Sequence, residues 1–100
     1  MPNSESYVQK KLKEALETAF PEIYLRKIHQ SMYSHNGIPD LLGCLNGHFF
    51  AVEVKTSNGI ITKLQLRELR LIKEAGGIAM ICYGKEGINE IIRVLESQAL

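Results

Sequence analysis

The chain has 100 residues, of which 45% are hydrophobic and 23% charged, and its net charge is +1. A chain of this length forms one modest hydrophobic core, so we treat residues 1–100 as a single domain. The sequence contains no apolar run of about 18 residues and no signal-peptide pattern, so we expect a cytoplasmic protein without a membrane span. The charge balance neither requires nor excludes a nucleic-acid partner, because such a partner needs only a local cluster of lysines and arginines.

The first predicted element is an amphipathic helix over residues 4–19. Its apolar positions follow helical spacing: Val8, Leu12, Ala15, Leu16 and Ala19. Asn3 or Ser4 can cap this helix, and Pro21 lies just beyond its end.

Strands then dominate the pattern. Residues 23–33 mix alternation with β-branched and aromatic residues, and "LLGCL" and "HFFAVEVK" flank Asn46-Gly47, the pair most typical of a two-residue hairpin turn. A helix from Thr62 to Ala75 follows, then the apolar strand "IAMICYG" and a last helix over roughly residues 86–98. The order α-β-β-β-α-β-α predicts an α/β fold with a mixed sheet and helices packed on it, because a helix between the last two strands makes them parallel.

The cysteines and histidines suggest no zinc site. Cys44 and Cys82 lie in apolar segments and form no C-x-x-C pair, which indicates two buried thiols in a reducing compartment. His29, His35 and His48 show no metal-ligand spacing with them.

Two acids are expected to meet at one end of the hairpin. A turn at Asn46-Gly47 would place Asp40 opposite Glu53, with Cβ atoms about 5 Å apart, where like charges repel. Lys55 would lie on the same face as Glu53, roughly 6.6 Å along the strand. Two hard oxygen ligands beside an ammonium would suit Mg²⁺ or Mn²⁺. The alternatives are a charged hairpin end that simply lies in solvent, or a bulge that shifts the register.

Glu5 and Gln65 have two interpretations each. Glu5 falls on the apolar face of the first helix and could reach the acidic pair, or could serve only the helix dipole. Gln65 fits a capping box in "TKLQ", but it shares a face with Leu69 and Ile72 and so also points toward the sheet.

Basic residues offer several DNA-binding candidates. The first is a row on the helix that carries Gln65, with an acid, Glu74, continuing it: Lys63, Arg67 and Arg70. The others are Lys10, Lys11 and Lys13 on the first helix, and Arg26 with Lys27. Each set could also be an ordinary solvated surface, and Glu74 favours that interpretation for the first row.

The ordered segments "SESYVQ", "GIPDLLG", "FFAVEVKTSNG", "LQ" and "AGGIAMI" resemble the PD-(D/E)xK nuclease superfamily, and within it the virus-type replication-repair nuclease (VRR-NUC) domain. The resemblance runs from about Glu5 to Tyr83 and implies a restriction-endonuclease-like core. It also implies that Asp40 and Glu53 bind Mg²⁺ or Mn²⁺ with help from the Val54 carbonyl. By the same resemblance, Lys55 acts on the attacking water, Glu5 is an accessory acid, and Gln65 supports the site or the scissile strand.

The function implied is a metal-dependent, structure-specific DNA endonuclease. Stand-alone members of the resembled family look like homodimers that cut branched DNA such as four-way (Holliday) junctions, and a phage or prophage origin is expected. Two alternatives remain open at this point: a nickase or restriction-type enzyme that acts on ordinary duplex, and a DNA-binding module of the same fold without turnover. The resemblance leaves the role of the C-terminal helix open.

Overall fold

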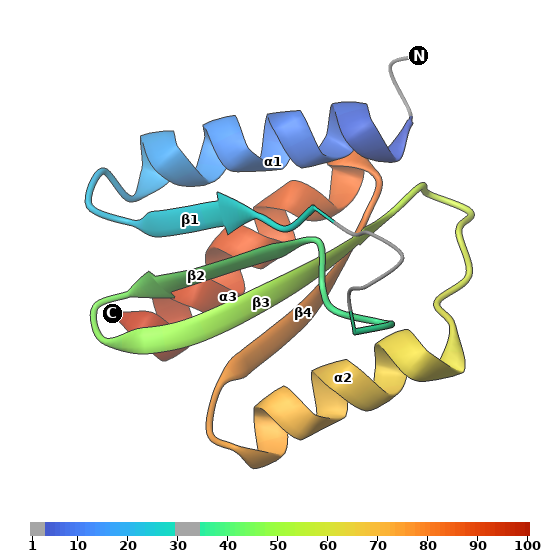
Figure 1. Cartoon of the computed structure of the whole chain (residues 1–100). Coiled ribbons are helices and arrows are strands. Elements are labelled where there is room, and N and C mark those ends of the chain that lie inside the picture. The colour runs from blue at the N-terminus through green and yellow to red at the C-terminus, as the bar shows by residue number, and fades with distance from the viewer. Residues whose placement is uncertain (1–3, 30–34) are drawn as a thin grey trace.

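The computed structural model describes residues 4–29 and 35–100, which form three helices and a four-stranded mixed sheet (Figure 1). In chain order the elements are α1 (Glu5–Ala19), β1 (Tyr24–Lys27), β2 (Leu41–Leu45), β3 (His48–Lys55), α2 (Lys63–Glu74), β4 (Ile78–Tyr83), the short 3-10 helix η1 (Lys85–Gly87) and α3 (Ile88–Ala99). The strands lie in the order β1-β2-β3-β4. The predicted α/β class and the order α-β-β-β-α-β-α are therefore confirmed.

The hairpin register is the one that the Asn46-Gly47 turn predicts. Asn46 and Gly47 have φ values of 51° and 82°, as a two-residue turn with two left-handed residues requires. Leu45 pairs with His48, and the ladder ends where Leu41 pairs with Val52, one residue short of Asp40. β3 and β4 are parallel, as the intervening helix predicts.

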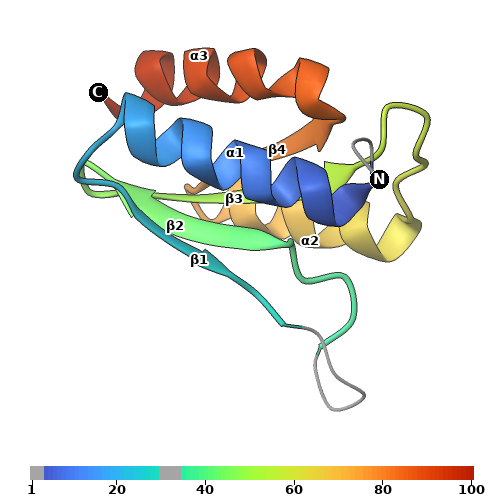
Figure 2. The same ribbon diagram turned by 90° about the horizontal axis from the view of Figure 1, so that it is seen from above.

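Helices cover the two faces of the sheet unequally. α1 and α3 pack side by side on one face, while α2 lies on the other face against β3 and β4 (Figures 1 and 2). The main core lies on the face that α1 and α3 cover, and fully or almost fully buried side chains fill it: Val8, Leu12, Leu16, Phe50, Val52, Val54, Ile91 and Leu95. The C-terminal helix thus completes the core. None of the helices in the described parts of the chain is long and apolar enough to cross a membrane.

The first two predicted helices, α1 and α2, begin at the expected caps. The Ser4 hydroxyl accepts a hydrogen bond from the Tyr7 N–H at the start of α1. Thr62 and Gln65 form a reciprocal capping box at the start of α2. These caps satisfy backbone N–H groups that a helix cannot satisfy internally, and they fix where each helix starts.

Two elements differ from their predicted bounds. The strand expected over residues 23–33 is only Tyr24–Lys27, although the Ile28 N–H still donates to the Asp40 carbonyl at 2.8 Å. Residues 30–33 of that prediction lie outside the described residues. The last helix begins at Ile88, because the preceding residues form η1, and it extends to Ala99.

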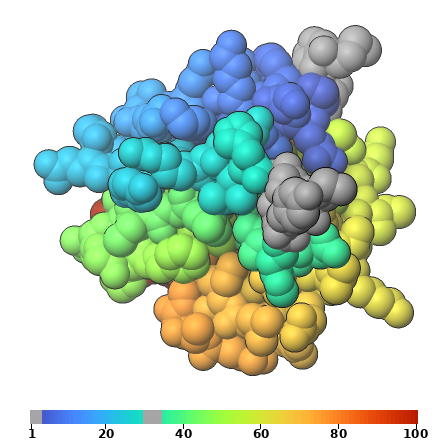
Figure 3. All heavy atoms as spheres, viewed as in Figure 1, coloured from blue at the N-terminus to red at the C-terminus, as the bar shows by residue number. Residues whose placement is uncertain are grey.

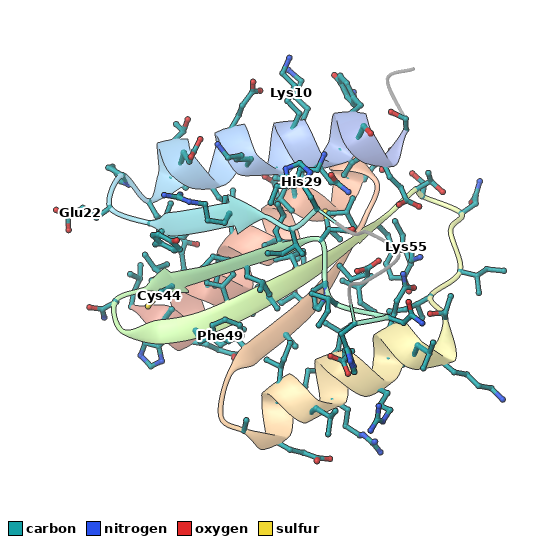
Figure 4. The ribbon with its side chains drawn as sticks, in the orientation of Figure 1. Lys10, Glu22, His29, Cys44, Phe49 and Lys55 are labelled. Carbon is teal, nitrogen blue, oxygen red and sulfur yellow. The ribbon has the colours of Figure 1, made fainter. Side chains whose placement is uncertain are left out.

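One part of the sheet surface has no helix over it. Cys44 lies there and is exposed, so the prediction that it is buried was wrong. Tyr24, Cys44 and Phe49 lie in one row across β1, β2 and β3, and all three are exposed because α2 covers only the β3–β4 side. We call this row the uncovered face. In Figure 3 the cyan and green spheres of these strands form the surface directly, and Figure 4 shows Cys44 and Phe49 side by side. Cys82 is buried as expected, and burial raises the pKa of its thiol to about 11.

Candidate functional site

Asp40 is held between two strands. Its carbonyl accepts a hydrogen bond from Ile28 N–H on the β1 side, and its Oδ2 accepts one from Val54 N–H in β3, both at 2.8 Å. The carboxylate therefore stands where the β2–β3 ladder would otherwise continue. Val54, whose carbonyl the resemblance implicates, lies beside it through this same hydrogen bond.

Glu53 is an acid buried under conditions that disfavour its charge. Glu53 is only 3% exposed, and its Oε2 accepts a hydrogen bond from Gln65 Nε2 at 2.9 Å. Burial is the main reason that its pKa rises from 4.5 to about 7, and the negative charge of Asp40 is the second. A hydrogen bond with Asp40 raises the pKa further, and Lys55 opposes the rise. The two acids thus interact as the hairpin register predicts.

Lys55 is buried on the same face of β3 as Glu53. It is 8% exposed, and its Nζ lies 3.8 Å from Glu53 Oε2. Strand alternation places both side chains toward α2, while Val52 and Val54 point into the core beneath α1 and α3. Figure 4 shows Lys55 at the opposite end of β3 from Phe49, so this site and the uncovered face are well separated.

Gln65 fills both roles that the sequence leaves open. Its Oε1 accepts from Thr62 N–H at 2.9 Å and completes the capping box. Its Nε2 donates to Glu53 at 2.9 Å. One amide side chain therefore ties the start of α2 to the buried acid on β3.

Glu5 lies at the rim of the site. It is exposed in the first turn of α1, and its charge adds the smallest of the contributions that raise the pKa of Glu53. The fold thus brings all five predicted site residues to one end of the sheet, with Glu5 at the rim: Asp40, Glu53, Lys55, Gln65 and Glu5.

A loop contact that the sequence analysis did not predict also positions Asp40. Gly37 has a φ of +85°, and a Cβ added there would lie 2.7 Å from the Leu64 carbonyl oxygen at the start of α2. In the same loop His35 Nε2 lies 3.3 Å from Glu68 Oε2. The segment before Asp40 is therefore docked on the helix that carries Gln65. Only the Asn-Gly pair at 36–37 hinted at a left-handed residue here.

The predicted basic residues lie in different surroundings. On α1, Lys11 lies 3.6 Å from Glu14, and Lys13 lies 3.2 Å from Glu17. Lys10 points away from the sheet in Figure 4.

Arg26 stacks over the Tyr24 ring at 4.3 Å, and Lys27 is exposed beside it. The row on α2 lines a shallow depression and has one internal ion pair, between Arg70 and Glu74 at 3.7 Å. Its other members, Lys63 and Arg67, make no ion pair within residues 4–29 and 35–100.

The donor set fits a hard divalent cation that keeps most of its water ligands. Two carboxylates converge, since the negative charge of Asp40 is, after burial, the second cause of the raised pKa of Glu53. In the described ranges no group of three or more His, Cys, Asp or Glu side chains could hold an ion. Mg²⁺ commonly binds one or two carboxylates together with water and substrate phosphates, so two acids are sufficient.

Comparison with solved structures gives an informative match. No protein-family model matches the chain, and no curated protein matches it. Among solved structures, one described as "VRR_NUC domain" superposes with a TM-score of 0.74 and 31% sequence identity. The alignment covers 89% of this chain and 94% of the other.

Gly37→Ala tests whether the docked loop positions Asp40. Gly47 is a matched control, because its φ of +82° carries the same backbone strain while an added Cβ would meet nothing within 4 Å. We expect the free energy of unfolding to be about 1–3 kcal/mol lower for Gly37→Ala than for Gly47→Ala, because only the first substitution forces the loop away from Leu64. Denaturant unfolding measures this difference. NMR titration of Glu53 should show a pKa change only in Gly37→Ala, and equal behaviour of both variants would contradict the positioning role.

Asp40→Asn tests the coupling of the two acids. The amide can still accept from Val54 but carries no charge, so the pKa of Glu53 should fall below about 7 while burial keeps it above 4.5. The folded state holds a proton that the unfolded state releases between these values. Stability should therefore fall as pH rises from about 4.5 to about 7, and less so in Asp40→Asn. Unfolding measured across this range checks the sign, and identical slopes for both proteins would refute the coupling.

Proposed function

This chain belongs to the VRR-NUC family, and from that premise we propose that it is a metal-dependent endonuclease that hydrolyses phosphodiester bonds in branched DNA. One observation carries the proposal: a buried acid, Glu53, is held against a second acid, with an ammonium and an amide directed at it. Such an arrangement is costly for stability, because it buries charge beside like charge. It is useful where a cation and a phosphate are to be bound.

The residues have distinct chemical tasks in this proposal. Asp40 and Glu53, with the Val54 carbonyl, would hold Mg²⁺ or Mn²⁺. When bound, the cation would offset their charge, polarise the phosphate and acidify a water molecule. The Lys55 ammonium, fixed by its contact with Glu53, would orient the attacking water and stabilise negative charge that develops on the phosphate.

Two further side chains would support the reaction. Gln65 holds the Glu53 carboxylate in one orientation through the bond from its Nε2, and its capped helix limits its own movement. Glu5, exposed at the rim, could accept hydrogen bonds from water around the cation as an accessory acid.

For DNA binding we favour the row on α2 over the lysines of α1. Lys63 and Arg67 lie in the first two turns of the helix that carries Gln65, so phosphates bound by them would lie close to the site. Lys11 is engaged by an acid and Lys10 points away from the sheet, which leaves them secondary candidates.

The proposal predicts metal-dependent cleavage that needs Asp40. Labelled four-way junction, continuous duplex and single-stranded DNA would be incubated with Mg²⁺, Mn²⁺ or EDTA. We expect junction cleavage with either metal, none with EDTA and none with Asp40→Ala. Lys55→Met should slow cleavage by about 10²–10³-fold, the range for loss of one group that stabilises developing charge.

Glu22→Ala is the matched control, because it removes an exposed acid at the far end of the molecule from Lys55 (Figure 4). Junction binding without cleavage under any metal would leave a DNA-binding module. Equal cleavage of continuous duplex would favour the nickase or restriction-type alternative.

We also propose that the protein acts as a two-fold dimer through the uncovered face. A two-fold interface places one patch against its own copy, and this row suits such an interface because its three side chains are uncharged, with Arg26 stacked over Tyr24 beside them. Tyr24 and Phe49 are 55% and 45% exposed in this row, with Cys44 between them. A dimer would bring two sites to the symmetric strands of a junction.

Phe49→Glu tests the dimer and its surface together. Light scattering should give two chains per particle for the wild type and one for the variant, because a buried pair of glutamates at the interface would repel. Leu71→Glu is the control, since it adds the same charge at an apolar residue of similar exposure, 40%, on α2. A monomeric wild type would refute the dimer, and a dimeric Phe49→Glu would refute this surface.

A further inference from the structure

Ile60 is far more exposed than the other large apolar residues in the described chain. It is 85% exposed, whereas the next value, 68%, belongs to Leu100 at the end of the chain, and the other exposed large apolar residues lie between 40% and 55%. Single exposed apolar residues are common on proteins. A nearly complete exposure beside a candidate active site calls for a reason.

The loop that presents Ile60 is well anchored. Gly59 N–H donates to the Thr56 carbonyl at 2.9 Å and closes a turn. Ser57 Oγ donates to Glu86 Oε2 at 3.0 Å, which ties the loop to η1, and Thr62 caps α2 on the other side. Ile60 is therefore presented to solvent by a fixed backbone.

Tyr83 brings an aromatic ring to the same place. It pairs with Lys55 in the parallel β3–β4 ladder, so both side chains project from the same face at the same level. Tyr83 is 40% exposed. The two segments also touch, because a Cβ added at Gly84 would lie 2.3 Å from Ser57 Oγ.

The residue before Ile60 approaches Lys55. A Cβ added at Gly59 would lie 3.0 Å from Lys55 Cβ. Ile60 and Tyr83 are thus carried by the two segments that adjoin the candidate catalytic lysine, and we call this pair the apolar rim.

An apolar rim beside a phosphodiesterase site needs an apolar surface on the substrate. Continuous duplex offers phosphates and sugars on its outside and keeps its bases stacked. Bases become available where strands part, and aromatic rings stack on them while side chains such as isoleucine wedge between steps. We propose that Ile60 and Tyr83 hold unstacked bases at the branch point of DNA, next to the bond to be cut. This deepens the proposed function and rests on it, because it favours branched DNA over continuous duplex.

The experiment measures binding and base unstacking without cleavage. A four-way junction with 2-aminopurine at the branch point, and a duplex of the same sequence, would be titrated with protein in EDTA and in Ca²⁺. Wild type should bind the junction more tightly than the duplex and raise 2-aminopurine fluorescence. Ile60→Ser and Tyr83→Ser should each lose about tenfold in junction affinity, typical of one lost base stack, with little change on duplex.

Conservative variants and a control separate this role from general damage. Ile60→Leu and Tyr83→Phe keep an apolar or aromatic side chain and should retain the fluorescence increase. Leu71→Ser removes an exposed apolar residue from α2 and should behave as wild type. Loss of junction and duplex affinity in equal measure, or no loss in either serine variant, would overturn the proposal.

The outcome is separable from that of the proposed function. If the wild type cuts nothing with any metal, yet the serine variants lose junction binding selectively, the apolar rim stands and the nuclease proposal fails. If the wild type cuts junctions and the serine variants match it in both binding and fluorescence, the nuclease stands and the apolar rim fails.

Discussion

The site depends on the burial of Glu53 beside Asp40. Two carboxylates in a low-polarity environment repel each other, and three donors from two elements, β3 and α2, offset this repulsion. Val54 N–H bonds Asp40, the Gln65 amide bonds Glu53, and the Lys55 ammonium lies near Glu53. Each donor stabilises the pair only where its own element is fixed. The packing of β2, β3 and α2 therefore determines whether the site exists at all.

The parallel β3–α2–β4 crossover makes this arrangement rigid. The chain leaves β3 directly after Lys55 and enters α2 at a capping box, so the first turn of the helix returns to the strand end. Gln65 uses its oxygen for the cap and its nitrogen for Glu53, which couples helix start and buried acid in one side chain. Gly37 then docks the segment before Asp40 against Leu64 on the same turn. Both acids thus take their positions from the start of α2.

Local sequence patterns predicted most of this, and tertiary contacts account for the rest. The Asn46-Gly47 turn was enough for the register and for the meeting of Asp40 with Glu53, because turn geometry and strand alternation are local rules. Gln65 both caps α2 and contacts the buried acid, so neither of its two interpretations from the sequence excludes the other. Cys44 was wrongly expected to be buried, since an apolar strand residue is covered only if a helix packs over it and α2 does not reach that far. The contact between Gly37 and Leu64 joins residues far apart in the sequence, and no periodic pattern predicts it.

The weak overall charge limits how this protein can select DNA. With a net charge of +1, long-range attraction to phosphates is small, and Lys11 and Lys13 lie near acids on their own helix. Phosphate contacts from a few residues, such as those proposed for Lys63 and Arg67, also carry no direct information on sequence. Under the proposed function, selectivity for branched DNA would then come from contacts that only some DNA can make. The apolar rim would meet that requirement, because bases unstack more readily at a branch than within a continuous duplex.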